Sequence, residues 1–456
     1  MLIKDFKTLK RMIKPKGVYR PEKFKPLEGF SIDSRTIKKG QGFVAVKGKL
    51  FDGHDFIPEA QSRGAACIIC QRSVGAGFKP ALKVPFLVVE DSYQALISIA
   101  SYIREKKKPF VYAITGSLGK TTTKEMLYFL LEGHCRVLKN KKTENNLLGV
   151  VKTIFSLNHQ EVVIAELGTN QPGEIGVLSG ILKPDVGVIT FVKPVHLEGL
   201  SSLEGIFREK ISLGLSNPAM KLVLNRDDAY LRRVKDKKNV YWFGTKSNNH
   251  LFARRIAKDS QNCWFRIQNA YELAIPNHLE GFITNVLAAV LSGHLYGIPI
   301  EKLVSKIKGF KKYPLMRMQI QKTARFSILN DAYNANPYSV KQALNSLKNH
   351  PLKKIAVIGD MLELGKKTAY YHRCLAPYLV KNKFDYCLTL GDYTRQLNRR
   401  LSQIGYKRAY HFSSHRDLAR FINQKIVPLK NQAKQYLIFL KGSRKMELEK
   451  IIPYLK

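Results

Sequence analysis

The 456-residue chain has few cysteines, few acidic residues and no long apolar run. Six cysteines are too sparse for a disulfide framework, which indicates a reducing compartment. Residues 1–16 carry charges throughout, so we expect no signal peptide. The stretch that comes nearest to a membrane span, residues 281–300, contains Asn, His and Pro, which favours a buried helix. These absences predict a cytoplasmic protein that does not cross a membrane.

Acidic residues are strongly outnumbered by basic ones. The chain has 77 Lys and Arg against 35 Asp and Glu, a net charge of +42. A charge of this size is typical of nucleic-acid-binding proteins. The excess is spread along the chain, however, with +11 in residues 1–107, +12 in 108–315 and +19 in 316–456. This distribution favours a solvated basic surface that attracts anionic small molecules, and we expect no nucleic-acid partner.

The length and the apolar pattern together predict the architecture. At about 150 residues per domain, 456 residues correspond to roughly three domains. In both later thirds, short apolar runs without alternation are separated by helical stretches, which indicates parallel sheets covered by helices. We expect an α/β protein of three domains, at residues 1–107, 108–315 and 316–456. The central one would be a P-loop-type parallel-sheet domain and the last one Rossmann-like.

The strongest local signal is the sequence ITGSLGKTTT at residues 114–123, after a predicted strand and before a helix expected to begin at Thr122. Glycines let backbone N–H groups approach phosphate oxygens, and a helix amino terminus adds positive potential. Lys120 can reach the terminal phosphates, and the Thr121 hydroxyl can bind Mg²⁺. The spacing is shorter than G-x-x-x-x-G-K-[ST], and the alternative is a glycine-rich turn with a chance Lys–Thr pair. The predicted ATP contacts are Thr115, Gly116, Ser117, Leu118, Gly119, Lys120, Thr121 and Thr122.

Two candidate metal ligands follow consecutive predicted strands. Glu166 follows the apolar run 162–165, and His196 follows the run 186–192. The carboxyl ends of parallel strands meet at one edge of a sheet, where nucleotides bind. Oxygen and nitrogen ligands at this edge suit a metal that assists phosphoryl transfer. Each residue alone also has an ordinary interpretation, a solvated loop carboxylate and a hydrogen-bonded surface imidazole.

Seven motifs, in chain order, resemble the Mur ligase family. They are TGSLGKTTT at 115–123, ENNLLG at 144–149, ELG at 166–168, HLE at 196–198, DAYNANP at 331–337, GDMLELG at 359–365 and KGSR at 441–444. Within the family, four features resemble the members that add a D-alanyl-D-alanine dipeptide. These are SIDSR at 31–35, FDGHDF at 51–56, the DAYNANP run, and GDMLELG followed by Tyr371-His372.

The resemblance implies an ATP-dependent ligase of peptidoglycan precursor synthesis that joins D-alanyl-D-alanine to a UDP-N-acetylmuramoyl-tripeptide. In such ligases the first domain holds the UDP-sugar, the second holds ATP and the third brings the dipeptide. The tripeptide carboxylate becomes an acyl phosphate, and the dipeptide amine then displaces phosphate. Two Mg²⁺ ions and Lys120 would neutralise the charge on the transferred oxygens. We expect the enzyme to be a monomer.

The resemblance also implies roles for individual residues. Thr121, Glu166 and His196 would hold magnesium, and Lys210 would carry a carbamate that adds an anionic ligand. The alternative for Lys210 is an ordinary exposed helical lysine. Nucleotide contacts are expected from Asn285, Arg317 and Asp331, and substrate contacts from Ser34, Arg35, Asn145, Asn146, Asn334 and Asn336. The last two are also candidates for simple turn formers before Pro337.

The chain departs from the family pattern near the expected nucleotide site. Phe191 replaces a usual Asn, Lys193 and Met316 replace usual glycines, and Gly281-Phe282 replaces a His-Asn pair. These changes bear on nucleotide affinity more than on the reaction class.

Three other functions fit parts of the sequence. Another Mur-type amino acid ligase, or a ligase like folylpolyglutamate synthase, would share the ATP site. A P-loop ATPase that binds nucleic acid would account for the charge. A binding protein that kept the fold and lost turnover would account for the departures.

Overall fold

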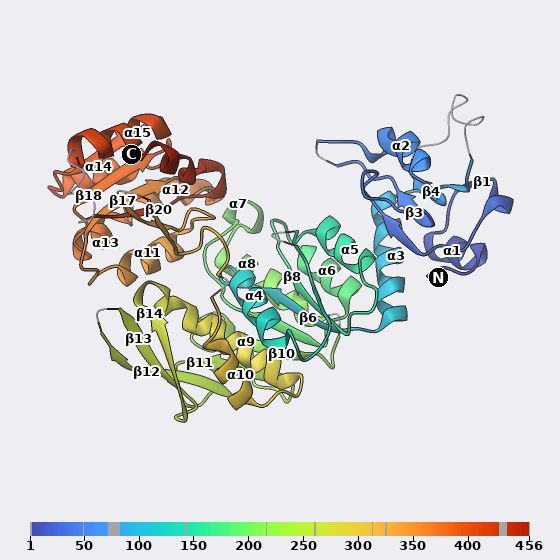
Figure 1. Ribbon diagram of the computed structural model, residues 1–456, viewed down its shortest axis with the longest axis horizontal. Helices are drawn as coiled ribbons and strands as arrows, with labels where there is room; N and C mark the ends of the chain where they lie inside the picture. The colour runs from blue at the N-terminus through green and yellow to red at the C-terminus, as the bar shows by residue number, and fades with distance from the viewer. Residues whose placement is uncertain are drawn as a thin grey trace. The chain divides into compact units, whose positions relative to one another are not determined.

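The computed structural model describes residues 2–48, 50–71, 83–141, 144–215, 217–259, 261–311, 313–323, 326–427 and 436–455. Over these residues the chain forms three sheets covered by helices, which confirms the predicted α/β class (Figure 1). The chain divides into two compact units. The first comprises Met1–Ala113, Gly133–Leu167 and Gly176–Asp185, and the second Ile114–Glu132, Gly168–Ile175 and Val186–Lys456. The domain bounds at 107/108 and 315/316 stay predictions.

A five-stranded sheet forms the amino-terminal part of the first unit. Its order is β1 (Gly17–Tyr19), β5 (Phe86–Val88), β4 (Cys67–Cys70), β3 (Gln41–Val44) and β2 (Gly29–Ser31). The strands are parallel except for β1, which is antiparallel to β5. All four residues of β4 are buried, so Cys67 and Cys70 are core residues, and they are not joined in a disulfide. The helices of this part are α1 (Phe6–Ile13), α2 (Ile57–Ser62) and α3 (Ser92–Lys107).

The central sheet has nine strands. Their order is β14 (Tyr271–Pro276), β13 (Asn262–Ile267), β12 (Leu251–Lys258), β11 (Val240–Gly244), β10 (Lys221–Asn225), β9 (Val186–Ile189), β6 (Phe110–Thr115), β8 (Val162–Glu166) and β7 (Val137–Lys139). The ladders from β9 to β12 and the β7–β8 ladder are parallel. Strands β12, β13 and β14 form an antiparallel meander that the sequence analysis did not predict.

The helices of the central part include a buried one where the sequence predicts it. They are α4 (Lys120–Leu131), α5 (Leu147–Phe155), α6 (Glu174–Leu182), α7 (Leu197–Leu200), α8 (Leu203–Ile211), α9 (Ile283–Leu295) and α10 (Ile300–Ile307). Helix α9 is buried over most of its length and packs on α4 and on strands β9 to β12. Within the described part of the chain, no helix has the length and apolar character needed to cross a membrane.

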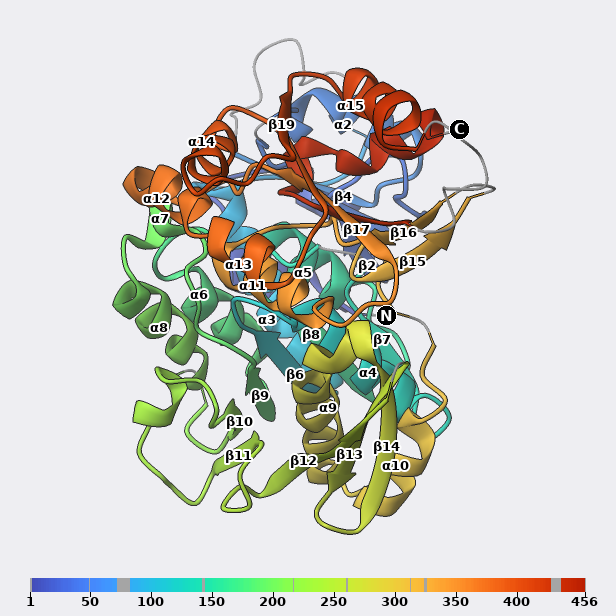
Figure 2. The ribbon, with the colours of Figure 1, turned by 90° about the vertical axis from the view of Figure 1, so that its left-hand side faces the viewer.

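The carboxyl-terminal sheet has six strands. Their order is β15 (Gln319–Lys322), β16 (Ser327–Asn330), β20 (Tyr436–Lys441), β17 (Lys353–Gly359), β18 (Tyr386–Leu390) and β19 (Ala409–Phe412), all parallel except β15. The helices are α11 (Pro337–Ser346), α12 (Thr368–Arg373), α13 (Ala376–Lys381), α14 (Arg395–Gln403) and α15 (His415–Phe421). Figure 2 shows α15 on the opposite side of this sheet from α11 and α13. A parallel sheet with helices on both faces is the Rossmann-like arrangement that we expected.

Candidate active site

The phosphate loop leads from β6 into α4, which begins at Lys120, two residues before the predicted start. Gly116 and Gly119 have φ values of 146° and 78°. A Cβ atom would lie 2.0 Å from Thr190 Oγ1 at Gly116, and 2.2 Å from Asn285 Nδ2 at Gly119. Both positions therefore need glycine for its backbone freedom and for its small volume. The loop is closely packed against Thr190 and Asn285.

Two of the departures from the family pattern contact this loop through their backbone atoms. Ser117 N–H donates to the Phe191 carbonyl at 2.7 Å. The Ser117 hydroxyl donates to the Lys193 carbonyl at 2.9 Å and accepts from the Lys193 N–H at 2.8 Å. The Lys193 side chain pairs with the buried Asp228 carboxylate at 2.8 Å and lies over the Tyr338 ring. Backbone atoms of Phe191 and Lys193 therefore hold the loop, while the Lys193 side chain neutralises the buried Asp228 carboxylate.

Arg317 reaches the loop from the segment that precedes β15. Its Nη2 donates to Thr121 Oγ1 at 3.0 Å, and its guanidinium lies 4.4 Å from the centre of the Tyr333 ring. Lys120 Nζ donates to the Gly116 carbonyl at 2.8 Å. The neighbouring Met316 has a φ of 55°, a left-handed conformation in which a side chain is unfavourable. The structure thus brings together three predicted nucleotide residues, Lys120, Thr121 and Arg317.

Asn285 connects α9 to the same loop. Its Nδ2 donates to the Gly119 carbonyl at 3.1 Å and to the Thr123 hydroxyl at 3.0 Å, and the residue is buried. This amide therefore fixes the loop and the first turn of α4. Its contact with adenine stays a prediction. The neighbouring Phe282 packs against Tyr313, with the two ring centres 5.7 Å apart.

Lys210 lies on α8 and is only 2% exposed, so it is not the exposed helical lysine of the alternative interpretation. Burial, and next the positive charge of Lys120, lower the pKa of Lys210 to about 7. The adjacent Glu209 accepts from the backbone N–H groups of Gly173 and Ile175 at 2.6 and 2.7 Å. The Lys210 amine is therefore partly neutral at physiological pH.

His196 contacts a residue of the carboxyl-terminal sheet's loops. Its Nδ1 lies 2.6 Å from Glu363 Oε2. The Leu197 N–H donates to the Glu363 carbonyl at 2.9 Å. Sequence reasoning did not single out Glu363, although it belongs to the GDMLELG motif at 359–365. The hydrogen bond from His196 lowers the pKa of the Glu363 carboxyl group.

Glu166 lies in the first unit, at the buried end of β8. Its Oε1 accepts from Asn145 Nδ2 at 3.0 Å. Asn140 holds its backbone with two hydrogen bonds, one from the Glu166 N–H and one to the Glu166 carbonyl. Asn146 caps α5 by accepting from the Gly149 N–H. Sequence reasoning missed Asn140, because it lies outside the ENNLLG motif.

A cavity of about 840 Å³ lies in the first unit beside the SIDSR segment. Its lining includes Ser31, Asp33, Lys139, Lys141 and Lys152. The two residues predicted for substrate binding in this segment have other partners in the described structure and do not belong to that lining: the Ser34 hydroxyl donates to Glu59, and the Arg35 guanidinium pairs with Asp33 at 2.8 Å.

The three predicted site residues of the carboxyl-terminal part, Asp331, Asn334 and Asn336, all bond to other protein groups in the structure. Asp331 pairs with the buried Lys441 at 2.5 Å and accepts from the Met318 N–H. Asn336 is the amino-terminal cap of α11, in a capping box with Ser339. These contacts are the ones expected if Asn336 only shapes the turn before Pro337 and does not bind substrate. Asn334 accepts from the Ala335 N–H through its own side chain. Substrate and nucleotide roles for Asp331, Asn334 and Asn336 stay predictions.

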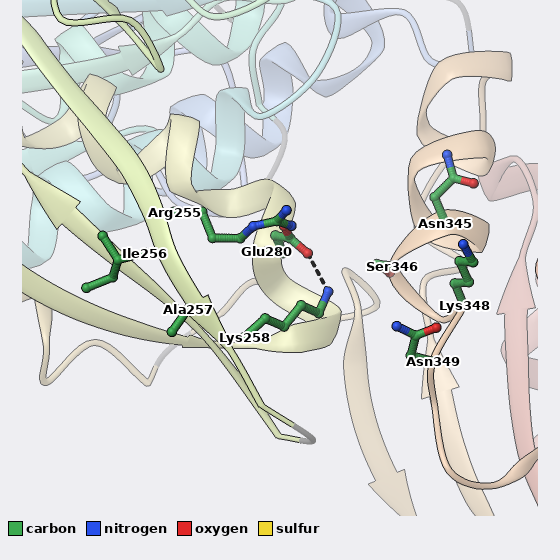
Figure 3. Close-up of a pocket in the computed structure, with 9 residues that line it drawn as sticks. All are labelled: Arg255, Ile256, Ala257, Lys258, Glu280, Asn345, Ser346, Lys348 and Asn349. Carbon is green, nitrogen blue, oxygen red and sulfur yellow. Dashed lines mark hydrogen bonds and ion pairs between the residues drawn. The ribbon is translucent and has the colours of Figure 1, made fainter.

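A second cavity, of about 620 Å³, lies in the second unit between β12 and the end of α11. Figure 3 shows Arg255 and Lys258 directed at the Glu280 carboxylate, with distances of 2.8 and 2.7 Å. Asn345, Lys348 and Asn349 lie on the facing side. Among the residues described around this cavity, none is a predicted site residue.

Comparison with known proteins places the chain in a family. Residues 26–104 match "Mur ligase family, catalytic domain", residues 114–293 match "Mur ligase middle domain", and residues 316–444 match "Mur ligase, glutamate ligase domain". Among curated relatives, the UDP-N-acetylmuramoyl-tripeptide–D-alanyl-D-alanine ligase of Buchnera aphidicola subsp. Baizongia pistaciae is 31% identical, covering 94% of this chain and 92% of the relative. The Bacillus subtilis protein of that name is 30% identical, covering 93% and 92%.

Solved structures agree with these relatives. A crystal structure of MurF from Acinetobacter baumannii has a TM-score of 0.86 and 25% identity, covering 99% of this chain and 98% of that chain. MurF from Thermotoga maritima, in complex with ADP, has a TM-score of 0.81 and 26% identity, covering 94% and 96%.

Proposed function

Because the chain belongs to the Mur ligase family, we propose that it joins D-alanyl-D-alanine to a UDP-N-acetylmuramoyl-tripeptide, with conversion of ATP to ADP and phosphate. The observation that carries the proposal is similarity over nearly the whole chain to ligases of this name. The three-sheet fold and the phosphate loop fit such a ligase. The chain is an ATP-dependent, ADP-forming ligase that acts in peptidoglycan synthesis.

The reaction brings anions together, and the second unit supplies cations for them. The tripeptide carboxylate attacks the γ-phosphorus of ATP, the bond to ADP breaks, and an acyl phosphate forms. Lys120 and Arg317 both lie at the phosphate loop, where their charges stabilise the oxygens being transferred. The dipeptide amine then attacks the acyl carbon, loses a proton and expels phosphate. The amide bond of the pentapeptide results.

Magnesium fits the donor set that the family implies, and it would supply Lewis-acid stabilisation of the phosphate oxygens. Thr121, Glu166 and His196 would hold it through oxygen and nitrogen atoms. Among the residues that the structure describes, no group of three or more His, Cys, Asp or Glu side chains could hold a metal by itself. The remaining ligands would therefore come from ATP and from Lys210.

Lys210 is suited to carry the carbamate. A neutral amine attacks the carbon of CO₂, loses a proton and becomes an anionic carbamate. The lowered pKa of Lys210, about 7, leaves an appreciable neutral fraction at physiological pH. The carbamate would replace a positive charge beside Lys120 with a negative one, which favours a cation ligand there.

The UDP-sugar would lie in the cavity beside the SIDSR segment. A nucleoside diphosphate is anionic, and Lys139, Lys141 and Lys152 line this cavity. Ser31 and Asp33 also line it; the Ser31 hydroxyl could donate to or accept from the uridine moiety, and the Asp33 carboxylate could accept from it. Arg35 would contact the substrate only after leaving its present partner, Asp33. Ser34 would likewise have to leave Glu59, to which its hydroxyl now donates.

We expect the enzyme to work as a cytoplasmic monomer. The low cysteine content, six in 456 residues, is the sequence feature that supports this expectation. Sedimentation of the purified protein tests the oligomeric state.

Substrate dependence of ADP release tests the proposed function. ADP should accumulate over many turnovers only when the UDP-tripeptide, the dipeptide and ATP are all present. A nucleic-acid-dependent ATPase would instead release ADP with DNA or RNA, and with a steep dependence on salt. ADP release that follows nucleic acid rather than the two peptide substrates would overturn the proposal.

A further inference from the structure

We propose that Glu363 is a positioning residue that fixes the His196 ring, so that Nδ1 carries a proton and Nε2 is left as the metal-binding atom. This inference rests on the proposed function and adds a residue from the carboxyl-terminal sheet's loops to the metal site. Glu363 acts through His196 and does not itself touch metal or substrate.

The first line of support is the contact itself. Glu363 Oε2 lies 2.6 Å from His196 Nδ1, an ion-pair distance, and Nδ1 is a buried ring nitrogen that makes no hydrogen bond of regular geometry to another group. A carboxylate accepts only, so a proton shared across this contact would lie on Nδ1 of the ring. The other ring nitrogen then presents its lone pair, which is the form of histidine that binds metals.

The second line of support is a backbone contact between the same two loops. The Leu197 N–H donates to the Glu363 carbonyl at 2.9 Å. His196 and Glu363 both adopt left-handed conformations, with φ values of 52° and 64°. Such conformations are uncommon for residues other than glycine and persist where the surroundings hold them. The two residues are therefore held against each other by backbone as well as by side chain.

The third line of support is the rigidity of the loop that carries Glu363. The Met361 N–H donates to Nε2 of the buried His372 at 3.0 Å, and the Leu362 N–H donates to the Ser443 hydroxyl at 2.9 Å. His372 is in turn fixed by a 2.8 Å contact from Nδ1 to the Thr368 carbonyl. A carboxylate on such a loop can orient an imidazole without losing much conformational entropy.

Partners of this kind matter energetically at metal sites. A carboxylate that accepts from the far nitrogen of a metal-bound histidine fixes the ring orientation and raises its basicity. Loss of such a partner weakens metal affinity by about 10- to 100-fold. We expect a loss of this size on removal of the Glu363 charge.

The main variant for the test is Glu363→Gln, which keeps the shape and the backbone contact and removes the charge. Glu198→Gln is the matched control. Glu198 is an exposed acid two residues from His196, and this substitution removes one negative charge, as Glu363→Gln does. Glu363→Asp should recover part of the loss, since it restores the carboxylate on a shorter side chain. Thermal unfolding should be similar for all three variants.

Two measurements do not depend on turnover. Electron paramagnetic resonance of Mn²⁺, titrated into protein saturated with ADP, gives metal affinity. Nitrogen-15 NMR of labelled histidines, assigned with a His196→Gln variant, gives the protonated nitrogen of His196 in the metal-free protein.

The inference predicts a His196 protonated at Nδ1 in the unmodified protein, with Mn²⁺ binding about 10- to 100-fold weaker in Glu363→Gln and unchanged in Glu198→Gln. Equal Mn²⁺ affinity in Glu363→Gln and the unmodified protein, or a His196 protonated at Nε2, would overturn it. If the unmodified protein ligates its substrates while either result holds, only the role of Glu363 fails. Failure of the unmodified protein to ligate at all would count against the proposed function instead.

Discussion

Arg317 Nη2 donates to Thr121 Oγ1 at 3.0 Å, so a residue that precedes the carboxyl-terminal sheet touches the hydroxyl expected to bind magnesium. The Arg317 guanidinium also lies over the Tyr333 ring, which limits the directions in which it can point. Under the proposed function, we expect the same guanidinium to neutralise the terminal phosphate of bound ATP.

We therefore expect Arg317→Ala to lower kcat by about 100-fold, the effect of removing one preorganised charge from a transition state. Arg317→Lys should recover little, because a lysine lacks the planar fork. Arg399→Ala, which removes an exposed arginine on α14, is the control. Steady-state kinetics with saturating substrates measure the effect, and an unchanged kcat in Arg317→Ala would exclude the role.

Lys210 predicts a pH dependence for activation by CO₂. The pKa of Lys210 is lowered to about 7, so the neutral amine predominates above this pH and becomes scarce below it. At equal concentrations of dissolved CO₂, protein depleted of CO₂ should regain activity quickly at pH 8 and about tenfold more slowly at pH 6. Carbon-13 NMR with labelled bicarbonate should show the carbamate carbon. Lys210→Arg should show neither response, and equal recovery at both pH values would contradict the assignment.

The contacts of Asn285 predict that removing its amide weakens nucleotide binding. The loss would come from a loosened phosphate loop rather than from a lost contact with the nucleotide. Asn285→Ala removes two hydrogen bonds, to Gly119 and Thr123, each worth about 1 kcal/mol. The two together make about 2 kcal/mol, so we expect ADP binding, measured by calorimetry, to weaken by about 30-fold. Asn285→Asp should be worse, because its carboxylate would face the Gly119 carbonyl. If Asn285→Asp binds ADP as well as the unmodified protein, the loop-fixing role is wrong.

Much of the phosphate site follows from the sequence, because its residues are close together in the chain. The loop from Thr115 to Thr122 has its predicted strand and helix on either side. The contact between His196 and Glu363 did not follow, because folding joins two segments that are far apart in the chain. Burial of Lys210 did not follow either, since its neighbours Arg208 and Glu209 make the segment look like a solvated helix.

The fold shows the same division between local and long-range signals. Fully apolar runs such as the one at β8 predicted parallel strands correctly, because both faces of the sheet are covered. The meander of β12, β13 and β14 was missed because its strands carry exposed charged residues, among them Arg254, Arg266 and Glu272. In β13, buried and exposed residues alternate along most of the strand, the pattern of a sheet with one solvated face.

The lowered pKa of His278 predicts that the free energy of unfolding falls in acid. Burial, and next the positive charge of His350, lower the pKa of His278 to about 4 from its ordinary value of 6.5. Between pH 6.5 and 4 the unfolded chain binds this proton and the folded chain does not, so the free energy of unfolding falls as the pH falls. The full effect is at most about 3 kcal/mol.

His278→Asn should remove that part of the acid slope, as measured by denaturant unfolding between about pH 7 and pH 4. His159→Asn, at an exposed histidine, is the matched control and should leave the slope unchanged. The prediction fails if the unmodified protein and His278→Asn lose stability equally over this range.

Oxygen transfer from the tripeptide carboxylate tests the ligase reaction most directly. UDP-N-acetylmuramoyl-tripeptide labelled with oxygen-18 in its terminal carboxylate is mixed with ATP, Mg²⁺, D-alanyl-D-alanine and the protein, with Lys120→Ala as the inactive control. An acyl phosphate predicts one labelled oxygen in each phosphate released, together with the mass of the pentapeptide product. Unlabelled phosphate, or ADP formed without any pentapeptide, would contradict the account.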